Sequence, residues 1–454
     1  MSQKQTDPQA LQKAMQASAP DQIDLAFAGL FDGTPTDRWL PATNGVMGPK
    51  GPGDLPKSAD AHTYASPILE DVLGYGAASV VLHCGDGWSY FSRGLAAFAS
   101  GSLEVAQHLL YYAELRAARS VLHRHGVFVF DNNSFYVTQS GETSPLNGFL
   151  ARTSTHQATW DVFDAWISVV APSFLGDQLR LSGRSLSDWA DSSASPVMVR
   201  AVIADLLRQW GVDLTLFLGD RTLRNQLSYD PNRLVRAPLG HSPAMIAACF
   251  QDAWSMLEPS GATSFDTFDS YLIREIFEHE FTSRRPDKTL ESPEFEGEID
   301  QMVSAVLGGA SPSLTSKFYG NDKAPTPAML KNASTDPSDA SINLAERVVG
   351  MLGRSMVLLR LATASAADLI TKSGVDKAEV GSWAEDLLEA RGVRPPEGTP
   401  PIYEELFLDV AIDLEAMDLL HSLVKTSDMR DMVAVDRQTA NLSIFERVPV
   451  WAVA

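Results

Sequence analysis

The chain has 454 residues, 44% of them hydrophobic and 20% charged, and a net charge of -21. This length and composition predict a soluble, globular protein with two or three domains or one extended helical array. The acidic balance argues against a broad nucleic-acid surface, which needs clustered Lys and Arg, and favours a basic protein partner; a small local basic site is compatible with it. The two cysteines lie in apolar surroundings and the N-terminus lacks the apolar core of a signal peptide, so we expect a cytoplasmic location.

Residues 1–65 combine two short helices with a loop-rich arm. Apolar spacing predicts helices over Pro8–Ser18 and Asp21–Leu30. The stretch that follows, FDGTPTDRWLPATNGVMGPKGPGDLPKSAD, contains many prolines and glycines, which exclude long regular structure. We expect this arm to be a plain linker or a segment that contacts a neighbouring surface or a partner.

Residues 66–190 form the first predicted domain. Two helices precede a long helix from Gly101 to His125, and a strand pair and a further helix follow it. The predicted strands are Val127–Phe130 and Phe135–Val137, because they flank the turn residues DNNS. This arrangement makes the long helix the central element of the domain.

The predicted helix Gly101–His125 has one wide apolar side and one polar side. The apolar side consists of two neighbouring stripes at helical spacing: Ala106, Leu110, Ala113, Ala117 and Val121, and Tyr111, Leu115, Ala118 and Leu122. The polar side is a ridge whose members follow each other at steps of three or four: Glu104, His108, Tyr112, Arg116, Arg119 and His123. This polar ridge brings several chemically capable groups together by simple helical geometry, so we take it as the candidate functional surface.

Helical spacing continues through most of the remaining chain. Residues 191–307 form a second helical region, and residues 308–339 form a linker rich in Pro, Ser, Gly and Asn. The second region contains three predicted helices: Pro196–Trp210, Pro243–Leu257 and Ser264–Phe281.

Residues 340–454 form a C-terminal helical domain that begins with the longest apolar helix of the chain, Ile342–Ile370. Arg354 and Arg360 are among the charges that interrupt this helix, so no segment has the roughly 18 uninterrupted apolar residues of a membrane span, and we expect a buried helix. The ending NLSIFERVPVWAVA predicts a short strand. The predicted fold class is mainly α and multi-helical, with a small β-hairpin after the long central helix and a short C-terminal strand.

Features of the first domain suggest a family. They are a Tyr pair, an Ala-Arg pair in the same helix and a Gly that enters a strand: Tyr111 and Tyr112, Ala118 and Arg119, and Gly126. With these features, the run from Gly87 to Val137 resembles helical proteins of the HEPN-like superfamily, particularly YaaC-like members found near prokaryotic defence genes. The segment Thr155–Trp166 is similar to one that follows in such proteins, and the resemblance covers about a fifth to a quarter of the chain.

The resemblance also implies a candidate catalytic pair. Active members of the superfamily are metal-independent ribonucleases that use an Arg and a His with four to six residues between them. Here the best match is Arg119 with His125, where the polar Ser120 follows the Arg; Arg116 with His123 also fits the spacing, but Ala117 follows the Arg, which departs from the pattern. His can move a proton at neutral pH while Arg holds a phosphodiester. An ideal helix places Arg119 and His125 on different sides, whereas Arg116 and His123 share a face. The alternative is that the arginines pair with acids of a neighbouring helix or of a protein partner.

The sequence predicts no cofactor and no metal. It contains no Walker A sequence, dinucleotide fingerprint, GxSxG elbow or HExxH motif. His279 lies between Glu278 and Glu280 in REIFEHEF, which has only a superficial likeness to a metal-binding helix.

Two hypotheses follow. The first is a non-enzymatic helical interaction or scaffold subunit of a prokaryotic, anti-phage defence complex, which docks a protein partner such as an ATPase or nuclease subunit. Its partner-binding residues would be on the polar ridge: Glu104, His108, Tyr112, Arg116 and Arg119. The alternative is a HEPN-like endoribonuclease that binds RNA, as a monomer or as a homodimer, with catalytic residues from the same helix: Arg116, Arg119, His123 and His125. The defence assignment comes from the resemblance alone.

Overall fold

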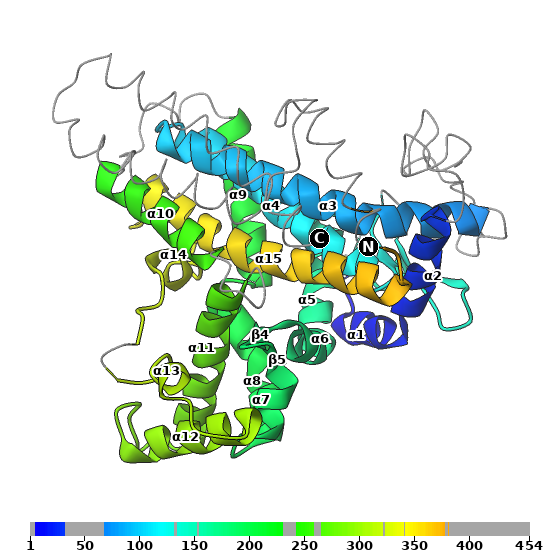
Figure 1. The fold of residues 1–454 in the computed structure, drawn as a ribbon. Helices are drawn as coiled ribbons and strands as arrows, with labels where there is room; N and C mark the ends of the chain where they lie inside the picture. Colours follow the sequence, from blue (N-terminus) through cyan, green and yellow to red (C-terminus); the bar gives the residue numbers. More distant parts are fainter. Residues whose placement is uncertain are drawn as a thin grey trace, which may run out of the picture.

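Helices dominate the computed structural model, which confirms the predicted mainly-α, multi-helical fold (Figure 1). The structure describes residues 5–31, 68–130, 134–151, 154–229, 242–257, 265–320, 323–339, 341–376 and 380. The helices of the N-terminal half are α1 Pro8–Ala17, α2 Pro20–Phe31, α3 Ile68–Ala99, α4 Leu103–Arg124, α5 Thr155–Val169, α6 Ala171–Gln178, α7 Leu186–Asp191, α8 Pro196–Gln209 and α9 Leu214–Tyr229. Those that follow are α10 Pro243–Met256, α11 Asp266–Arg284, α12 Pro293–Leu307, α13 Pro312–Thr315, α14 Ala328–Lys331 and α15 Leu344–Ser373.

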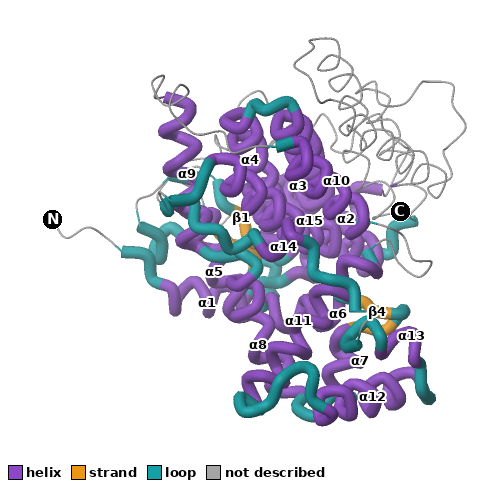
Figure 2. The backbone as a smooth tube through the Cα atoms, turned by 90° about the vertical axis from the view of Figure 1, so that its left-hand side faces the viewer, coloured by secondary structure: helices purple, strands orange, loops and turns teal. Residues whose placement is uncertain are grey.

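Three long helices form the centre of the molecule. Helix α4 packs against both α3 and α15, and α3 and α15 also contact each other (Figures 1 and 2). Helix α2 covers one end of this group through contacts with α3 and α15, while α5 and α9 pack on α4. The predicted central helix is therefore surrounded by elements from distant parts of the chain.

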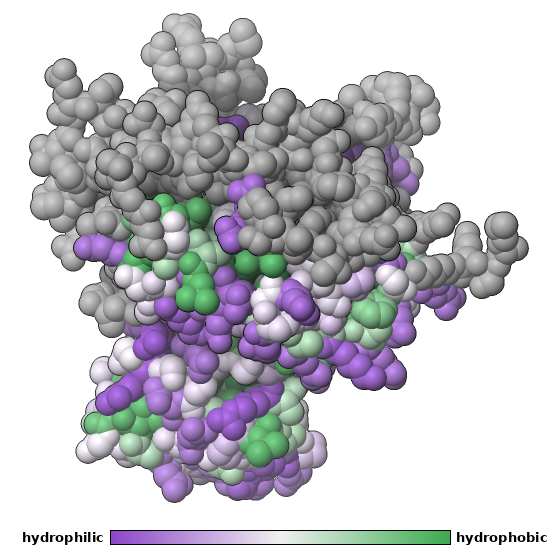
Figure 3. Space-filling view, turned by 90° about the vertical axis from the view of Figure 1, so that its right-hand side faces the viewer, coloured by the Kyte–Doolittle hydropathy of each residue, from purple (hydrophilic) through white to green (hydrophobic). Residues whose placement is uncertain are grey.

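A second group of helices extends below this centre in the view of Figure 1. It contains α7, α8, α11, α12 and α13, with α11 packed on α8 and α12 packed on α7 and α13. On the face shown in Figure 3, hydrophobic residues of this group form small separate areas between hydrophilic ones.

Helix α4 is stabilised by its alanines and ends at a glycine. Ala has the highest helix propensity, and Ala106, Ala113 and Ala117 are fully buried, which lets neighbouring helices approach closely. After the last turn, Gly126 has φ +70°, a left-handed conformation that other residues adopt at a cost, and its N–H donates to the carbonyl of His123 at 2.9 Å. The chain then leaves the helix directly into a strand.

The predicted hairpin after α4 is present and gains a third strand. Strand β1 (Val127–Phe128) pairs antiparallel with β2 (Phe135–Val137), with Phe128 opposite Phe135. Strand β3 (Thr143–Pro145) then pairs with the other edge of β2. β1 is shorter than the predicted Val127–Phe130. A second, two-stranded sheet joins β4 and β5, Arg180–Leu181 and Arg184–Ser185. The predicted C-terminal strand lies outside the described residues.

Helix α15 is the one described helix that is long and apolar enough to cross a membrane, and the whole of its apolar window is buried inside the protein. The prediction of a buried helix is confirmed. It starts with a capping box between Asn343 and Glu346 and ends at Gly374, which has φ +72°. Its glycines allow close packing: a Cβ atom on Gly353 would lie 2.2 Å from the carbonyl oxygen of Met329.

Buried arginines tie α15 and α4 to their neighbours. Arg354 of α15 forms ion pairs with Glu114 of α4 and Asp220 of α9, and all three side chains are at most 1% exposed. Arg360 donates to both carboxylate oxygens of Asp269 in α11, at 2.7 and 2.8 Å. These pairs link helices that belong to all three predicted helical regions. One continuous hydrophobic core also runs through those regions; the domain boundaries at 65, 190, 307 and 339 remain predictions.

Candidate functional site

The polar ridge of α4 changes character along its length. Glu104, His108, Tyr112, Arg116 and Arg119 are each partly exposed. His123, the last member, is only 2% exposed. Val105 lies next to the ridge, three residues before His108 on the helix, and its side chain is about half exposed (52%). The N-terminal half of the ridge is thus accessible, whereas its C-terminal end lies in the protein interior.

At the buried end of the ridge, a second histidine from α3 joins the cluster. His83 packs against His123 with ring centroids 5.2 Å apart, and Arg116 Nη1 lies 3.1 Å from His83 Nδ1. Arg can only donate, so His83 Nδ1 accepts this hydrogen bond and carries no proton. Burial lowers the pKa of His83 well below its ordinary value and that of His123 to about 3, and nearby arginines add to both shifts. Both imidazoles are therefore neutral at pH 7.

Toward the middle of α4, the ridge meets aromatic and cationic groups of α5 and α9. Tyr111 Oη lies 2.9 Å from His156 Nδ1 of α5, and their rings stack. The guanidinium of Arg224 in α9 lies over the rings of Tyr111 and Tyr112, 5.1 and 5.6 Å from their centroids. These cation–π contacts hold Arg224 against α4 without neutralising its charge.

Four arginines act on this region electrostatically. Burial lowers the pKa of His156 to about 4, and the positive charges of Arg119, Arg224, Arg221 and Arg116 lower it further. Burial also lowers the pKa of Arg119 to about 10, with the charge of Arg116 as the second cause. Arg119 nevertheless remains protonated at neutral pH. The region is a concentration of positive charge in a protein whose net charge is -21.

Several polar atoms of this cluster are buried without a hydrogen-bond partner among the residues that the structure describes. They are Nε of Arg119, Nε of Arg224 and Nδ1 of His123. Arg116 has an ion pair with Asp86, but the two atoms are 3.8 Å apart and both side chains are partly exposed. We call the group made by His83, Arg116, Arg119, His123, His156, Arg221 and Arg224 the arginine–histidine cluster. Its chemistry fits an anion, because it offers donors and positive charge in excess of acceptors.

The structure separates the two histidines of the candidate catalytic pairs. His125 lies on the far side of α4, where its ring contacts Trp166 and Phe174 and its Nδ1 lies 2.9 Å from the carbonyl oxygen of Val121. Burial lowers its pKa to about 4. No contact joins Arg119 to His125 within the described chain, whereas the charges of Arg119 and Arg116 both act on His123. The arrangement groups the arginines with His123 rather than with His125.

Sequence reasoning found the α4 members of the cluster and missed the others. His83, His156, Arg221 and Arg224 come from α3, α5 and α9, and no spacing in the sequence links them to α4. His156 lay inside the Thr155–Trp166 segment that supported the resemblance, but its proximity to Tyr111 is a tertiary contact.

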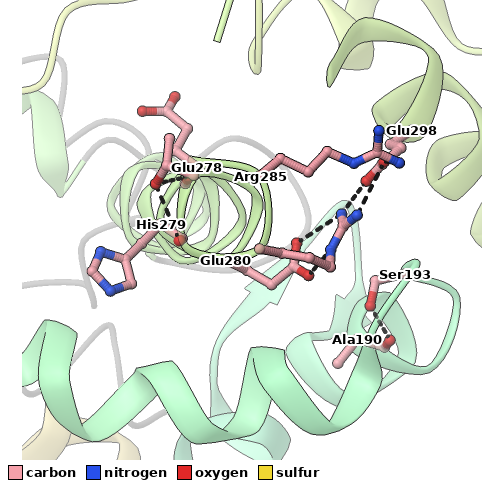
Figure 4. Close-up of polar contacts among 9 residues, drawn as sticks. Ala190, Ser193, Glu278, His279, Glu280, Arg285 and Glu298 are labelled. Atoms are coloured by element: carbon pink, nitrogen blue, oxygen red, sulfur yellow. Dashed lines mark hydrogen bonds and ion pairs between the residues drawn. The ribbon is translucent and has the colours of Figure 1, made fainter. Parts of the chain in front are cut away.

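The second histidine-containing motif, REIFEHEF, has a structural role in α11. Arg284 forms ion pairs with Glu280 at 2.7 Å and with Glu298 of α12, and Arg285 pairs with the same Glu298 at 2.9 Å. Figure 4 shows His279 pointing away from Glu298 on the opposite side of α11. These ion pairs join α11 to α12, and no group of three metal-ligating side chains occurs among the described residues.

No family model matches this chain, and neither curated proteins nor solved structures give a significant match.

Proposed function

We propose that this chain is a helical interaction subunit of a prokaryotic defence complex and has no enzymatic activity of its own. The observation that supports this best is the accessible N-terminal half of the α4 ridge. Val105 exposes about half of its apolar surface there, beside the partly exposed Glu104 and His108. An apolar residue flanked by polar ones on a rigid helix is a typical anchor for a protein partner.

The charge of the chain favours a basic partner surface. A net charge of -21 attracts positively charged proteins over a distance of about one Debye length and raises their rate of association. An ATPase or nuclease subunit with a basic face would fit this surface and would supply the catalysis. The assignment to defence rests on the resemblance to YaaC-like proteins.

The test is co-purification from cells that express the chain with its genomic neighbours. We expect a defined partner to co-purify with the wild type and to be lost with a Val105→Asp, Glu104→Arg variant. A matched control is Val197→Asp on α8, which changes a residue that is 78% exposed and far from α4 in sequence. Equal recovery of the partner with all three proteins would contradict docking on this ridge.

A second candidate function, RNA cleavage, is supported by a different observation. Arg116, Arg119 and His123 lie in one cluster, where a phosphodiester could be held beside an imidazole. A His with a pKa of about 3 is a weak base, but a bound phosphate would raise that pKa by neutralising the arginines. Such a ribonuclease could act as a homodimer.

Cleavage of RNA by purified protein tests this candidate. If it is correct, His123→Gln and Arg119→Gln lose activity, while His279→Gln on α11 keeps it and serves as the control. Activity that survives in His123→Gln, or that is absent from the wild type, would rule out catalysis by this cluster.

A further inference from the structure

Most positive charges of the arginine–histidine cluster have no counter-charge among the residues that the structure describes. Arg119, Arg221 and Arg224 form no ion pair with any residue that the structure describes. The ion pair of Arg116, whose charge acts on Arg119, with Asp86 is long, at 3.8 Å. Like charges held close together destabilise a folded protein unless something neutralises them.

The carboxylates closest to these arginines along α4 and α9 are already engaged elsewhere. Glu114 and Asp220 both bind Arg354 of α15, on the buried side of the helices. On α5, Asp161 accepts a hydrogen bond from Thr6, and Asp164 lies 3.9 Å from Arg208. These four carboxylates are therefore engaged in contacts other than with Arg119 or Arg224.

The buried donors point to what would complete the cluster. Nε of Arg119 and Nε of Arg224 have no acceptor in the described part of the chain, and a buried donor without an acceptor is destabilising. Arg224 is also fixed over two tyrosine rings, so its guanidinium is ordered before any ligand binds. An anion that reached these groups would meet donors that are already in place.

We propose that the arginine–histidine cluster is a binding site for a phosphate group, carried by a small phosphate ester or by the backbone of an RNA. Arginine matches phosphate because its planar fork donates two hydrogen bonds to two oxygens of the same group. Arginines of two helices, α4 and α9, suit a group with three or four oxygens better than a carboxylate with two. The acidic remainder of the protein repels anions and so confines them to this position.

This site goes beyond the proposed docking function and does not depend on it. The partner would bind at Glu104, Val105 and His108, whereas the phosphate would bind around Arg119 and Arg224. A variant can therefore lose binding of the partner and keep binding of the phosphate, or the reverse. Phosphate binding also requires no RNA cleavage, so a protein that binds but does not cleave would support this proposal and contradict the ribonuclease candidate.

Calorimetric titration of the full-length protein at low salt tests the site, with 5′-AMP and a short single-stranded RNA as the two probes. We expect the wild type to bind at least one probe and the Arg119→Gln, Arg224→Gln double variant to bind it at least about tenfold more weakly. Binding of 5′-AMP as tight as that of RNA would identify a small phosphate ester as the source, and binding of RNA alone would identify the nucleic-acid backbone. Arg200→Gln on α8, a half-exposed arginine paired with Asp191, is the matched control and should bind like the wild type.

A second variant and a second measurement keep the test independent of folding. Arg221→Gln with Arg224→Gln changes only α9, and should also weaken binding. The NMR pKa of His156 in the wild type should rise when phosphate binds, because the ligand offsets the arginine charges that lower it. Failure of the wild type to bind either probe, or unchanged affinity in both double variants, would overturn the proposal.

Discussion

Arg354 and Arg360 of α15 are in the opposite electrostatic situation to the arginines of the arginine–histidine cluster. Both are almost fully buried; Arg354 is held by two carboxylates of other helices and Arg360 by one. Arg119 and Arg224 are partly exposed and hold no carboxylate within the described chain, although each has a buried Nε without an acceptor. The two groups lie on α4 itself or on helices that pack against it, α15 and α9.

This difference separates charges that hold the fold together from charges that are available to a ligand. A buried arginine without a carboxylate partner is an uncompensated charge in the protein interior, which destabilises the fold. The need to fold is therefore enough to explain why Arg354 is paired with two carboxylates. Folding alone does not explain several arginines around α4 that have no carboxylate partner among the described residues, because they repel each other. The proposed phosphate ligand would explain them, and single substitutions in each group of arginines test this difference.

Arg354→Ala should cause the largest loss of stability. It leaves Glu114 and Asp220 buried without a cation, and breaking one partner of a buried ion pair costs about 3–5 kcal/mol. Urea unfolding measures the loss. Arg200→Ala, at a half-exposed ion pair on α8, should cost at most about 1 kcal/mol. Similar losses from the two substitutions would mean that the α15 pairs do not hold the helices together.

Part of the pH dependence of stability should come from His125. Its pKa is about 4 in the folded protein, against an ordinary value of 6.5. The unfolded state therefore binds more protons between these values, and stability falls as the pH falls from about 6.5 to about 4. One such histidine contributes a slope of about 1.4 kcal/mol per pH unit.

Comparison with His125→Phe isolates this contribution, since the carboxylates titrate in both proteins. The difference in unfolding free energy between wild type and variant should be constant above pH 7. As the pH falls to 5, the wild type should lose more stability than the variant. Parallel curves over this whole range would show that His125 is not buried as the structure has it.

The sequence predicted the mainly helical fold because local patterns determine helices, but the two helices predicted before Gly101 are the single helix α3, Ile68–Ala99. Alanine and leucine spacing gave the central helix, which runs from Leu103 to Arg124, and Gly126 marked its end. The long apolar helix was found from composition, within three residues at each end. The β3 strand was missed, because Thr143–Pro145 has neither the length nor the apolar alternation of a typical strand.

The candidate site was predicted only in the part that lies on one helix. Helical spacing placed Arg116, Arg119 and His123 on one face, and the structure keeps them together. The partners on α3, α5 and α9 depend on how helices pack, which a single sequence does not encode in a readable spacing. The same limit applies to His123: periodicity placed it on the polar side, but packing of α3 and of Phe128 buries it.

Arg116→Gln should have a small effect, because this residue is intermediate between the two groups of arginines. It donates to His83 at 3.1 Å and has a long contact with Asp86, and about a quarter of its side chain is exposed (28%). Contacts of this kind contribute about 0.5–1 kcal/mol. Thermal unfolding should show a modest decrease in the melting temperature. A loss as large as that of Arg354→Ala would place Arg116 with the structural arginines.

Arg119→Gln should have the smallest effect on stability, and this is the sharpest test of the contrast. Burial lowers the pKa of Arg119 to about 10 from 12.5, so its charge opposes folding at neutral pH. Removing the charge relieves that cost and the repulsion from Arg116, while the shorter side chain loses some packing. We expect these effects to cancel within about 0.5 kcal/mol in urea unfolding without ligand. The wild type, and not the variant, should then become more stable when a saturating phosphate ester is added. A loss above about 2 kcal/mol without ligand would show instead that Arg119 is held by the fold, and the unpaired arginines around α4 would then need no ligand to explain them.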